Sequence, residues 1–315
     1  MKTKRSFFTL LTLPLTYMAT WWLKLISGRG YHEKVDQIFM KLRVLPLLDH
    51  YYAPLINPKK ELRKSLREDR NLVGIDLNVA EQLSVLQKFK FNEELEGIPL
   101  EKPTSLAFYY NNGSYCSGDA EYLYNMIRHF KPKRIIEIGS GNSTLMAINA
   151  LEENKKQDVN YNCEHICIEP YEMPWLEKTG VKVIREKVES LDMDVFRSLG
   201  ENDILFIDSS HIIRPQGDVL FEFLEILPNL NSGVLVHVHD IFSPKDYLDE
   251  WIYKRHYLWN EQYLLEAFLC FNSEFRVIGA LNYLSHNYTE EFSKACPIFA
   301  KQKDREPGAF WIVKK

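Results

Sequence analysis

A Gly-x-Gly turn, Gly139 to Gly141, directly follows an apolar run in the segment IIEIGSGNST at 135–144. Glycine allows the backbone to turn sharply at the tip of a strand and to approach a ligand closely. The helix expected to follow offers free backbone N–H groups in its first turn, where polar ligand atoms can bind. The segment therefore indicates a ligand site at the junction of a strand and a helix.

Two acidic side chains accompany this turn. Glu137 stands inside the apolar run, where an unpaired charge would be costly, so a cationic ligand group would suit it. Glu169 ends the next expected strand, where a carboxylate can accept both hydroxyls of a ribose. Thr144 stands where a dinucleotide-binding fingerprint has its third glycine. The pattern favours a nucleoside ligand over NAD.

Further carboxylates end the fourth and fifth expected strands, at Asp208 and Asp240. Both should reach the crevice outside the carboxyl ends of a parallel sheet, where ligands bind in open α/β folds. His211 follows the first of these acids, and His239 precedes the second, on the same strand face as His237. Imidazole can act as a general base near neutral pH. Each histidine taken alone is also explained as a packed, hydrogen-bonded side chain.

The elements that must position these residues alternate between strand and helix. Apolar strands are expected within 131–141 and 196–211 and at 165–170, 181–188 and 233–241, with helices before, between and after them. This alternation predicts a Rossmann-like, doubly wound, mostly parallel sheet. At the C-terminal end, 275–284 and 308–315 read as two strands with no clear helix between them, which predicts an antiparallel closing pair.

Three of these strand ends carry a family resemblance. The motifs EIGSGNST, IEP and FIDSSH resemble the first, second and fourth strand-end motifs of class I S-adenosylmethionine-dependent methyltransferases. The segments SGDAEYLYNMIRHFKP and HVHDIFSPKDYL resemble the branch called the methyltransferase domain 24 family. The resemblance covers about residues 105–315. It implies an enzyme that transfers a methyl group from S-adenosylmethionine, most simply to a hydroxyl oxygen of a small molecule or glycan intermediate.

The resemblance also implies roles for individual residues. Glu137 would lie near the sulfonium or amino group of the donor, and Glu169 would hold the ribose. The other implied donor contacts are Gly139, Ser140, Gly141, Ser143 and Asp208. Asp208, His211, His239 and Asp240 are the implied catalytic residues. In catechol-type and macrocin-type O-methyltransferases, acids at the places of Asp208 and Asp240 bind Mg²⁺, but those families follow the second acid with Asn or Asp, where this chain has Ile241.

The N-terminal third is expected to differ from the methyltransferase domain at 105–315. Residues 31–104 are expected to form a helical cap. An uncharged segment between Arg5 and Lys24 is at the lower edge of the length of a membrane span, with Trp21 and Trp22 near its end. Membrane contact through residues 6–26 and packing of the 1–30 helix on protein both remain open.

Composition excludes some functions and leaves others open. The net charge of −4 disfavours a nucleic-acid partner. Five cysteines form no disulfide framework and favour reduced thiols in the cytoplasm. Two alternative functions remain at this point. One is an NAD-dependent oxidoreductase or epimerase on the same sheet class, and the other is a non-catalytic protein that keeps the donor fold as a scaffold at a membrane.

Overall fold

The computed structural model describes residues 9–27 and 32–315 and contains two compact units. The first, called the N-terminal unit here, comprises residues 1–65 together with 252–258. The second, called the sheet unit, comprises residues 66–251 and 259–315.

The N-terminal unit consists of short helices joined by extended loops. Its helices are α2 (Leu13–Ser27), α3 (Glu33–Leu42) and α4 (Pro58–Glu61). His32 precedes α3 and its ring accepts the backbone N–H of Lys34, which caps the first turn. In the two described stretches of chain, no helix combines the length and apolar character needed to cross a bilayer.

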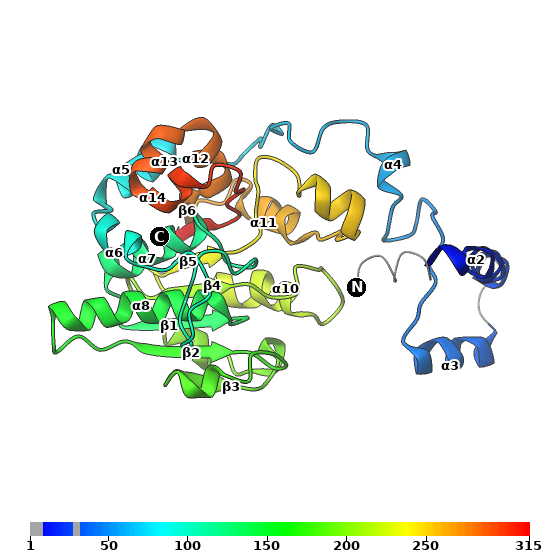
Figure 1. Cartoon of the computed structure of the whole chain (residues 1–315), viewed down its shortest axis with the longest axis horizontal. Helices are drawn as coiled ribbons and strands as arrows, with labels where there is room; N and C mark the ends of the chain where they lie inside the picture. The colour runs from blue at the N-terminus through cyan, green and yellow to red at the C-terminus, as the bar shows by residue number, and fades with distance from the viewer. Residues whose placement is uncertain (1–8, 28–31) are drawn as a thin grey trace. The chain divides into compact units, whose positions relative to one another are not determined.

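Seven strands of the sheet unit form one mixed sheet in the order β3-β2-β1-β4-β5-β7-β6 (Figure 1). The strands are β1 (Arg134–Ile138), β2 (Glu164–Ile168), β3 (Lys182–Ile184), β4 (Ile204–Ile207), β5 (Leu235–Val238), β6 (Phe275–Ala280) and β7 (Phe310–Lys314). Strands β1 to β5 are parallel, whereas β7 pairs antiparallel with both β5 and β6. The predicted fold class, a Rossmann-like sheet with an antiparallel C-terminal pair, is confirmed.

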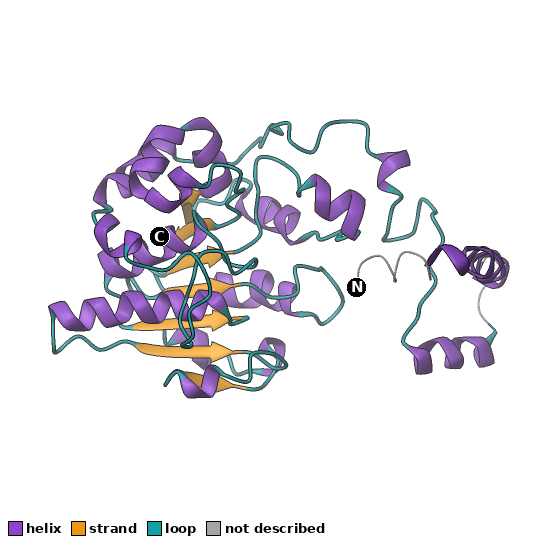
Figure 2. Ribbon diagram, viewed as in Figure 1, coloured by secondary structure: helices purple, strands orange, loops and turns teal. Residues whose placement is uncertain are grey.

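Alternating strand residues point to opposite faces of this sheet, so both faces carry an apolar core. Ile135, Phe206 and Trp311 belong to one core, and Ile136, Leu205 and Ile312 to the other. Helices cover both faces (Figure 2), as expected for strands that are buried on either side. The helical segments of the sheet unit are α5 (Val79–Lys88), α6 (Asn92–Glu96), α7 (Asp119–Phe130), α8 (Asn142–Gln157), η1 (Leu176–Lys178), η2 (Val188–Ser190), α9 (Asp194–Arg197), α10 (Asp218–Phe221), η3 (Glu222–Ile226), η4 (Leu227–Asn229), α11 (Glu261–Leu269), α12 (Leu281–Asn287), α13 (Thr289–Ala295) and α14 (Pro297–Lys301), while η5 (Trp251–Arg255) straddles the two units.

The structure places the end of the leading region earlier than the sequence analysis did. The two units part between Ser65 and Leu66, not at 104. Helices α5 and α6 belong to the sheet unit because their apolar residues join its core, where Leu86 and Leu95 are buried. Outside α3 to α6, the predicted helical cap at 31–104 is mostly loop.

The region between the last two strands was also predicted wrongly. Strand β6 ends at Ala280, and α12, α13 and α14 stand between it and β7. Leu281, Leu284 and Phe292 from these helices are fully buried in the same core as α5 and α7. The short apolar stretch after Ala280 therefore belongs to a helix and not to a strand. Periodicity alone does not distinguish the two in such a short run.

Candidate functional site

An open pocket of about 650 Å³ lies at the carboxyl ends of β1, β2 and β4. Parallel strands bring these ends to one edge of the sheet, where the connecting loops form a crevice. The residues expected to contact a donor are found in its wall, with one exception: Gly139, Ser140, Gly141, Ser143, Glu169 and Asp208 all line it. Tyr115, Lys187, Arg214 and Asp218 also line the pocket.

Gly139 makes the tight turn that opens the pocket. Its φ is +77°, a region that favours glycine, and a Cβ placed there would overlap the backbone carbonyl oxygen of Asp208. The Gly139 N–H donates to Ile168 at 3.0 Å, and the Asp208 N–H donates to Ile138 at 2.8 Å. The turn therefore holds the tips of β1, β2 and β4 close together, and only glycine fits it.

The carboxylate of Glu169 is fixed at the pocket wall by backbone donors. Its Oε1 accepts the N–H groups of Tyr171 at 3.0 Å and Glu172 at 2.9 Å, and its Oε2 accepts Ser140 N–H at 3.4 Å. Arg185 holds the same loop by donating to the backbone carbonyls of Glu169 at 2.9 Å and Glu172 at 2.6 Å. This preorganised acid still has acceptor capacity for ligand hydroxyls.

Glu137 is the exception, because the structure does not bring it to the pocket wall. Its side chain lies on the opposite face of β1 from Ile138, and it is fully buried. One carboxylate oxygen contacts His165 Nε2 at 3.1 Å, and the other accepts the Thr144 hydroxyl at 2.5 Å. Burial alone would lower the pKa of His165, but the charge of Glu137 raises it to about 10. The cation that compensates Glu137 is therefore a protein side chain and not a donor group.

Thr144 explains why no third glycine is needed here. Its hydroxyl oxygen accepts the backbone N–H of Gly141 at 3.1 Å while the hydroxyl proton goes to Glu137. Glu137 thus holds the glycine turn in place through Thr144, which lies in the first turn of α8. Its contribution to the site is structural.

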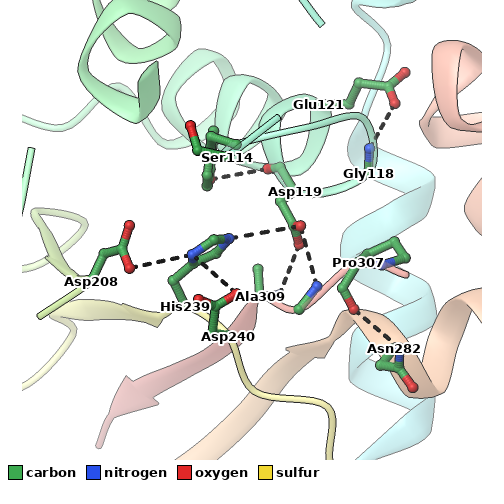
Figure 3. Close-up of polar contacts among 12 residues, drawn as sticks. Ser114, Gly118, Asp119, Glu121, Asp208, His239, Asp240, Asn282, Pro307 and Ala309 are labelled. Atoms are coloured by element: carbon green, nitrogen blue, oxygen red, sulfur yellow. Dashed lines mark hydrogen bonds and ion pairs between the residues drawn. The ribbon is translucent and has the colours of Figure 1, made fainter. Parts of the chain in front are cut away.

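A cluster of two carboxylates and two imidazoles lies where β4 and β5 end. His211 Nε2 is 3.3 Å from Asp208 Oδ1 and 3.5 Å from Asp240 Oδ2. His239 Nδ1 is 3.4 Å from Asp208 Oδ1 and 3.6 Å from Asp240 Oδ1. Figure 3 shows the His239 ring between these acids and Asp119. All four expected catalytic residues therefore meet in one place, and Asp208 also lines the pocket.

Two further acids in this cluster were missed by the sequence analysis. Glu261, at the start of α11, is fully buried, and its Oε2 lies 2.7 Å from His211 Nδ1. Asp119, at the start of α7, lies 3.8 Å from His239 Nε2 and accepts the backbone N–H groups of Gly308 and Ala309. Each is the first residue of its helix, and that position was the available signal.

The backbone at this cluster is strained. His211 and Asp240 have φ values of +60° and +57°, which are uncommon for residues with side chains. The His211 carbonyl accepts the N–H groups of Asn260 and Glu261 at 3.1 and 3.2 Å. The Asn260 side chain in turn accepts the Ile213 N–H at 2.6 Å. The start of α11 therefore holds the loop after β4 in a conformation that aims His211 at both aspartates.

Mutual charge shifts the protonation of the whole cluster. Burial alone would lower the pKa of His211, but hydrogen bonds to Asp208 and Glu261 raise it well above its ordinary value. Burial opposes protonation of His239 in the same way, and the charges of Asp240 and Asp208 raise its pKa. Burial acts to raise the pKa of Asp208, yet the two histidines lower it. At neutral pH the cluster therefore holds imidazolium rings beside ionised carboxylate.

These positions were also the expected Mg²⁺ ligands, and the donor set does not fit that ion. Mg²⁺ favours oxygen ligands in octahedral geometry with several waters. Here Asp208, His211 and Asp240 offer only two carboxylates beside one imidazole within 4.8 Å. His211 and His239 already lie against both carboxylates, and the side chain of Ile241 supplies no further oxygen ligand. The expected magnesium site is therefore a carboxylate–imidazole cluster.

His237 lies outside the site. Its ring stacks on Phe206 with centroids 4.1 Å apart and an interplanar angle of 7°. Neither ring nitrogen has a hydrogen-bond partner among the described residues, and burial lowers its pKa well below the ordinary value. The packing agrees with the alternative interpretation of this histidine, but the hydrogen bond that it expected is not among the contacts of the described residues.

Comparison with known proteins connects this site to one domain family. A family model described as a methyltransferase domain matches residues 136–241, which contain the glycine turn, Glu169 and both aspartates. A protein of Archaeoglobus fulgidus described as uncharacterized is 31% identical over 194 residues, which span 58% of this chain and 83% of the relative. Among solved structures, the O-methyltransferase from Bacillus cereus in complex with SAH is 12% identical, with a TM-score of 0.35, over 82% of this chain and 94% of that one.

Proposed function

This chain belongs to the class I S-adenosylmethionine-dependent methyltransferases, and from that premise we propose that its pocket binds S-adenosylmethionine and that the enzyme methylates a hydroxyl oxygen. The observation that carries the proposal is the position of Asp208. This residue lines the pocket that contains Glu169 and the glycine turn, and it also belongs to the cluster that can take up a proton.

The donor half of the proposal depends on Glu169 and the glycine turn. Glu169 accepts the two ribose hydroxyls, as an acid at the end of the second strand does in nucleoside-binding sheets. Gly139, Ser140, Gly141 and Ser143 let the donor approach the backbone closely at the start of α8. The volume of about 650 Å³ is within the range of pockets that hold ligands of this size.

The acceptor half depends on the cluster around Asp208. The hydroxyl oxygen attacks the methyl carbon in line with the sulfur, so the sulfur–carbon bond breaks as the carbon–oxygen bond forms. The hydroxyl proton passes to the neutral form of His211, which Glu261 and Asp240 orient. The products are S-adenosylhomocysteine, a methyl ether and an imidazolium. Holding the two reactants at near-attack distance is the largest contribution expected of the protein.

The charge of the pocket supports a small-molecule or glycan acceptor. Glu169, Glu172, Glu189, Asp208 and Asp218 line it, against Lys187 and Arg214. A polyanionic nucleic acid would meet net repulsion there. We therefore propose an uncharged or weakly charged acceptor with a reactive hydroxyl.

Calorimetry and product analysis test this function together. The protein should bind S-adenosylhomocysteine and not NAD⁺, and a labelled methyl donor should yield a labelled ether with a hydroxyl-bearing acceptor. Binding of NAD⁺ in its place would favour the oxidoreductase alternative. Donor binding without turnover on a broad panel of acceptors would favour the scaffold alternative.

Replacing Glu169 by alanine is expected to weaken binding of S-adenosylhomocysteine by about 1–3 kcal/mol, because charge-assisted hydrogen bonds to the ribose are lost. Titration calorimetry measures the change. Glu152→Ala removes an equal charge from the exposed face of α8 and serves as the control. Equal affinities of the Glu169→Ala variant and the native protein would show that the ribose binds elsewhere.

Chelation is expected to leave the enzyme active. Because the donor set does not fit Mg²⁺, saturating EDTA should change the initial rate by less than about twofold. The same assay with added Mg²⁺ should give the same rate. A large loss in EDTA that Mg²⁺ restores would reinstate Asp208 and Asp240 as metal ligands.

A further inference from the structure

Exposed apolar side chains concentrate in the N-terminal unit. Among the described residues, 19 of the 30 large apolar side chains that are exposed lie between Leu10 and Ile56. No residue of α2 is buried. Seven of its large apolar side chains are 47–78% exposed, namely Leu13, Leu15, Tyr17, Met18, Trp21, Trp22 and Leu25. An exposed apolar surface of this extent usually marks a binding site for protein or lipid.

The weakly polar residues along α2 are adapted to an apolar environment. Thr16 and Thr20 each donate the side-chain hydroxyl to the carbonyl four residues earlier, at 3.0 and 2.8 Å. Ser27 does the same toward Leu23 at 2.7 Å. A hydroxyl that is already hydrogen-bonded within its helix is much less costly to remove from water. The threonine stripe therefore does not oblige this side of α2 to face solvent.

The N-terminal unit also differs in charge from the rest of the chain. Residues 1–65 contain twelve Lys and Arg against four Asp and Glu, a net charge of +8, whereas the whole chain has a net charge of −4. Lys24, Lys41 and Lys64 are exposed members of this set. Basic residues beside exposed Trp, Tyr and Leu form the combination that binds the surface of an anionic bilayer.

From these observations we infer that residues 9–27 and 32–65 form a peripheral membrane-binding surface for anionic lipid. The apolar side chains of α2 enter the headgroup and acyl boundary of one leaflet, with Trp21 and Trp22 at headgroup depth. The lysines and arginines contact anionic headgroups. Charge complementarity selects this occupant over a second copy of the chain, because two copies would bring the same positive charges together.

Flotation of the full chain with lipid vesicles tests the inference. The native protein should float with phosphatidylcholine vesicles that contain about one quarter phosphatidylglycerol, a composition that sets the negative surface potential. A triple variant, Trp21→Ser, Trp22→Ser and Leu25→Ser, should bind these vesicles at least about 100-fold more weakly. Brominated lipid should quench tryptophan fluorescence in the native protein and much less in the triple variant.

Matched variants distinguish binding through this surface from nonspecific adsorption to vesicles. Val73→Ser, Leu100→Ser and Leu224→Ser remove equally exposed apolar side chains from the sheet unit and should bind as the native protein does. Lys24→Gln, Lys41→Gln and Lys64→Gln together should weaken binding to anionic vesicles by about 100-fold and leave weak binding to pure phosphatidylcholine unchanged.

Three results would overturn the inference. The first is a native protein that does not float, and the second is a Trp21/Trp22/Leu25 variant that floats equally well while its unfolding midpoint is unchanged. The third is a concentration-dependent dimer, seen by sedimentation, that the triple variant abolishes in the absence of vesicle binding. That result would assign the surface to a second copy of the chain. None of these outcomes bears on donor binding in the sheet unit.

Discussion

Replacing Gly139 by alanine is expected to destabilise the sheet unit by about 3–5 kcal/mol and to abolish measurable donor binding. About 1–2 kcal/mol comes from forcing a residue with a Cβ to positive φ. The remainder comes from overlap between that Cβ and the carbonyl oxygen of Asp208, which belongs to rigid backbone. Relief of the overlap would separate the tips of β1 and β4, so the pocket wall and the cluster would both move. Urea unfolding and calorimetry with S-adenosylhomocysteine measure the two effects.

Gly180 supplies the matched control. Its φ is +82°, close to that of Gly139, but a Cβ placed there meets nothing within 4 Å. Gly180→Ala should therefore show only the conformational cost, about 1–2 kcal/mol, with donor affinity unchanged. If the two variants were equally stable, the close approach of the strand tips would not constrain residue 139. Retained donor affinity in Gly139→Ala would remove the glycine turn from the binding site.

The strand-end residues could be predicted from the sequence because one topological rule locates them. In a parallel sheet all carboxyl ends share an edge, so any acid that ends a strand is brought near the others. Glu169, Asp208 and Asp240 satisfied this rule without knowledge of side-chain packing. The antiparallel pairing of β7 with β6 was also predicted, but from the expected lack of a helix between them, and three helices lie there. The pairing of β7 with β5 was not predicted.

The fate of Glu137 could not be predicted in the same way. An acid in a buried strand needs a compensating cation, but the sequence does not say whether ligand or protein supplies it. The answer depends on the register of β1 and β2, which places Ile135 opposite His165 and Glu137 opposite Cys167. His165 therefore lies on the same face of the sheet as Glu137. It stands on the neighbouring strand, two residues before the position opposite Glu137. A shift of one residue would have turned the imidazole to the other face.

Glu261 could not be predicted for a different reason. It lies 50 positions after His211 in the chain, and their contact depends on how α11 returns over the end of β4. Asn260 and Glu261 read locally as the ordinary start of a helix. Only the backbone hydrogen bonds from both residues to the His211 carbonyl show that this helix positions a site residue.

Replacing His211 by alanine is expected to lower kcat by about 10²–10⁴-fold with little change in donor affinity. The imidazole is the group placed to accept the proton of the acceptor, and it touches both Asp208 and Asp240. His286→Ala is a suitable control, because His286 also pairs with a carboxylate, Glu306 at 2.9 Å, but lies outside the pocket and the cluster. A His211→Ala variant as active as the control would assign proton transfer to another group.

The raised pKa of His211 sets the sign of two pH dependences. Hydrogen bonds to Asp208 and Glu261 favour the imidazolium, so the neutral form that accepts a proton is populated only as the pH rises above the ordinary histidine range. We therefore expect kcat to increase from neutral toward alkaline pH. The same ionisation stabilises the fold below the pKa of the unfolded chain, and that stability is lost as the pH rises through the folded pKa. Activity should thus increase over the range in which the unfolding free energy decreases.

Glu261→Gln distinguishes this ionisation from simple positioning. The substitution keeps the size of the side chain but removes a charge that raises the pKa of His211, so both pH profiles should move to lower pH. A role limited to holding the ring in place would reduce kcat at every pH and leave the midpoint of the profile where it was. A native rate that falls with increasing pH would instead show that the imidazolium acts in the reaction as a cation, by stabilising the developing oxyanion.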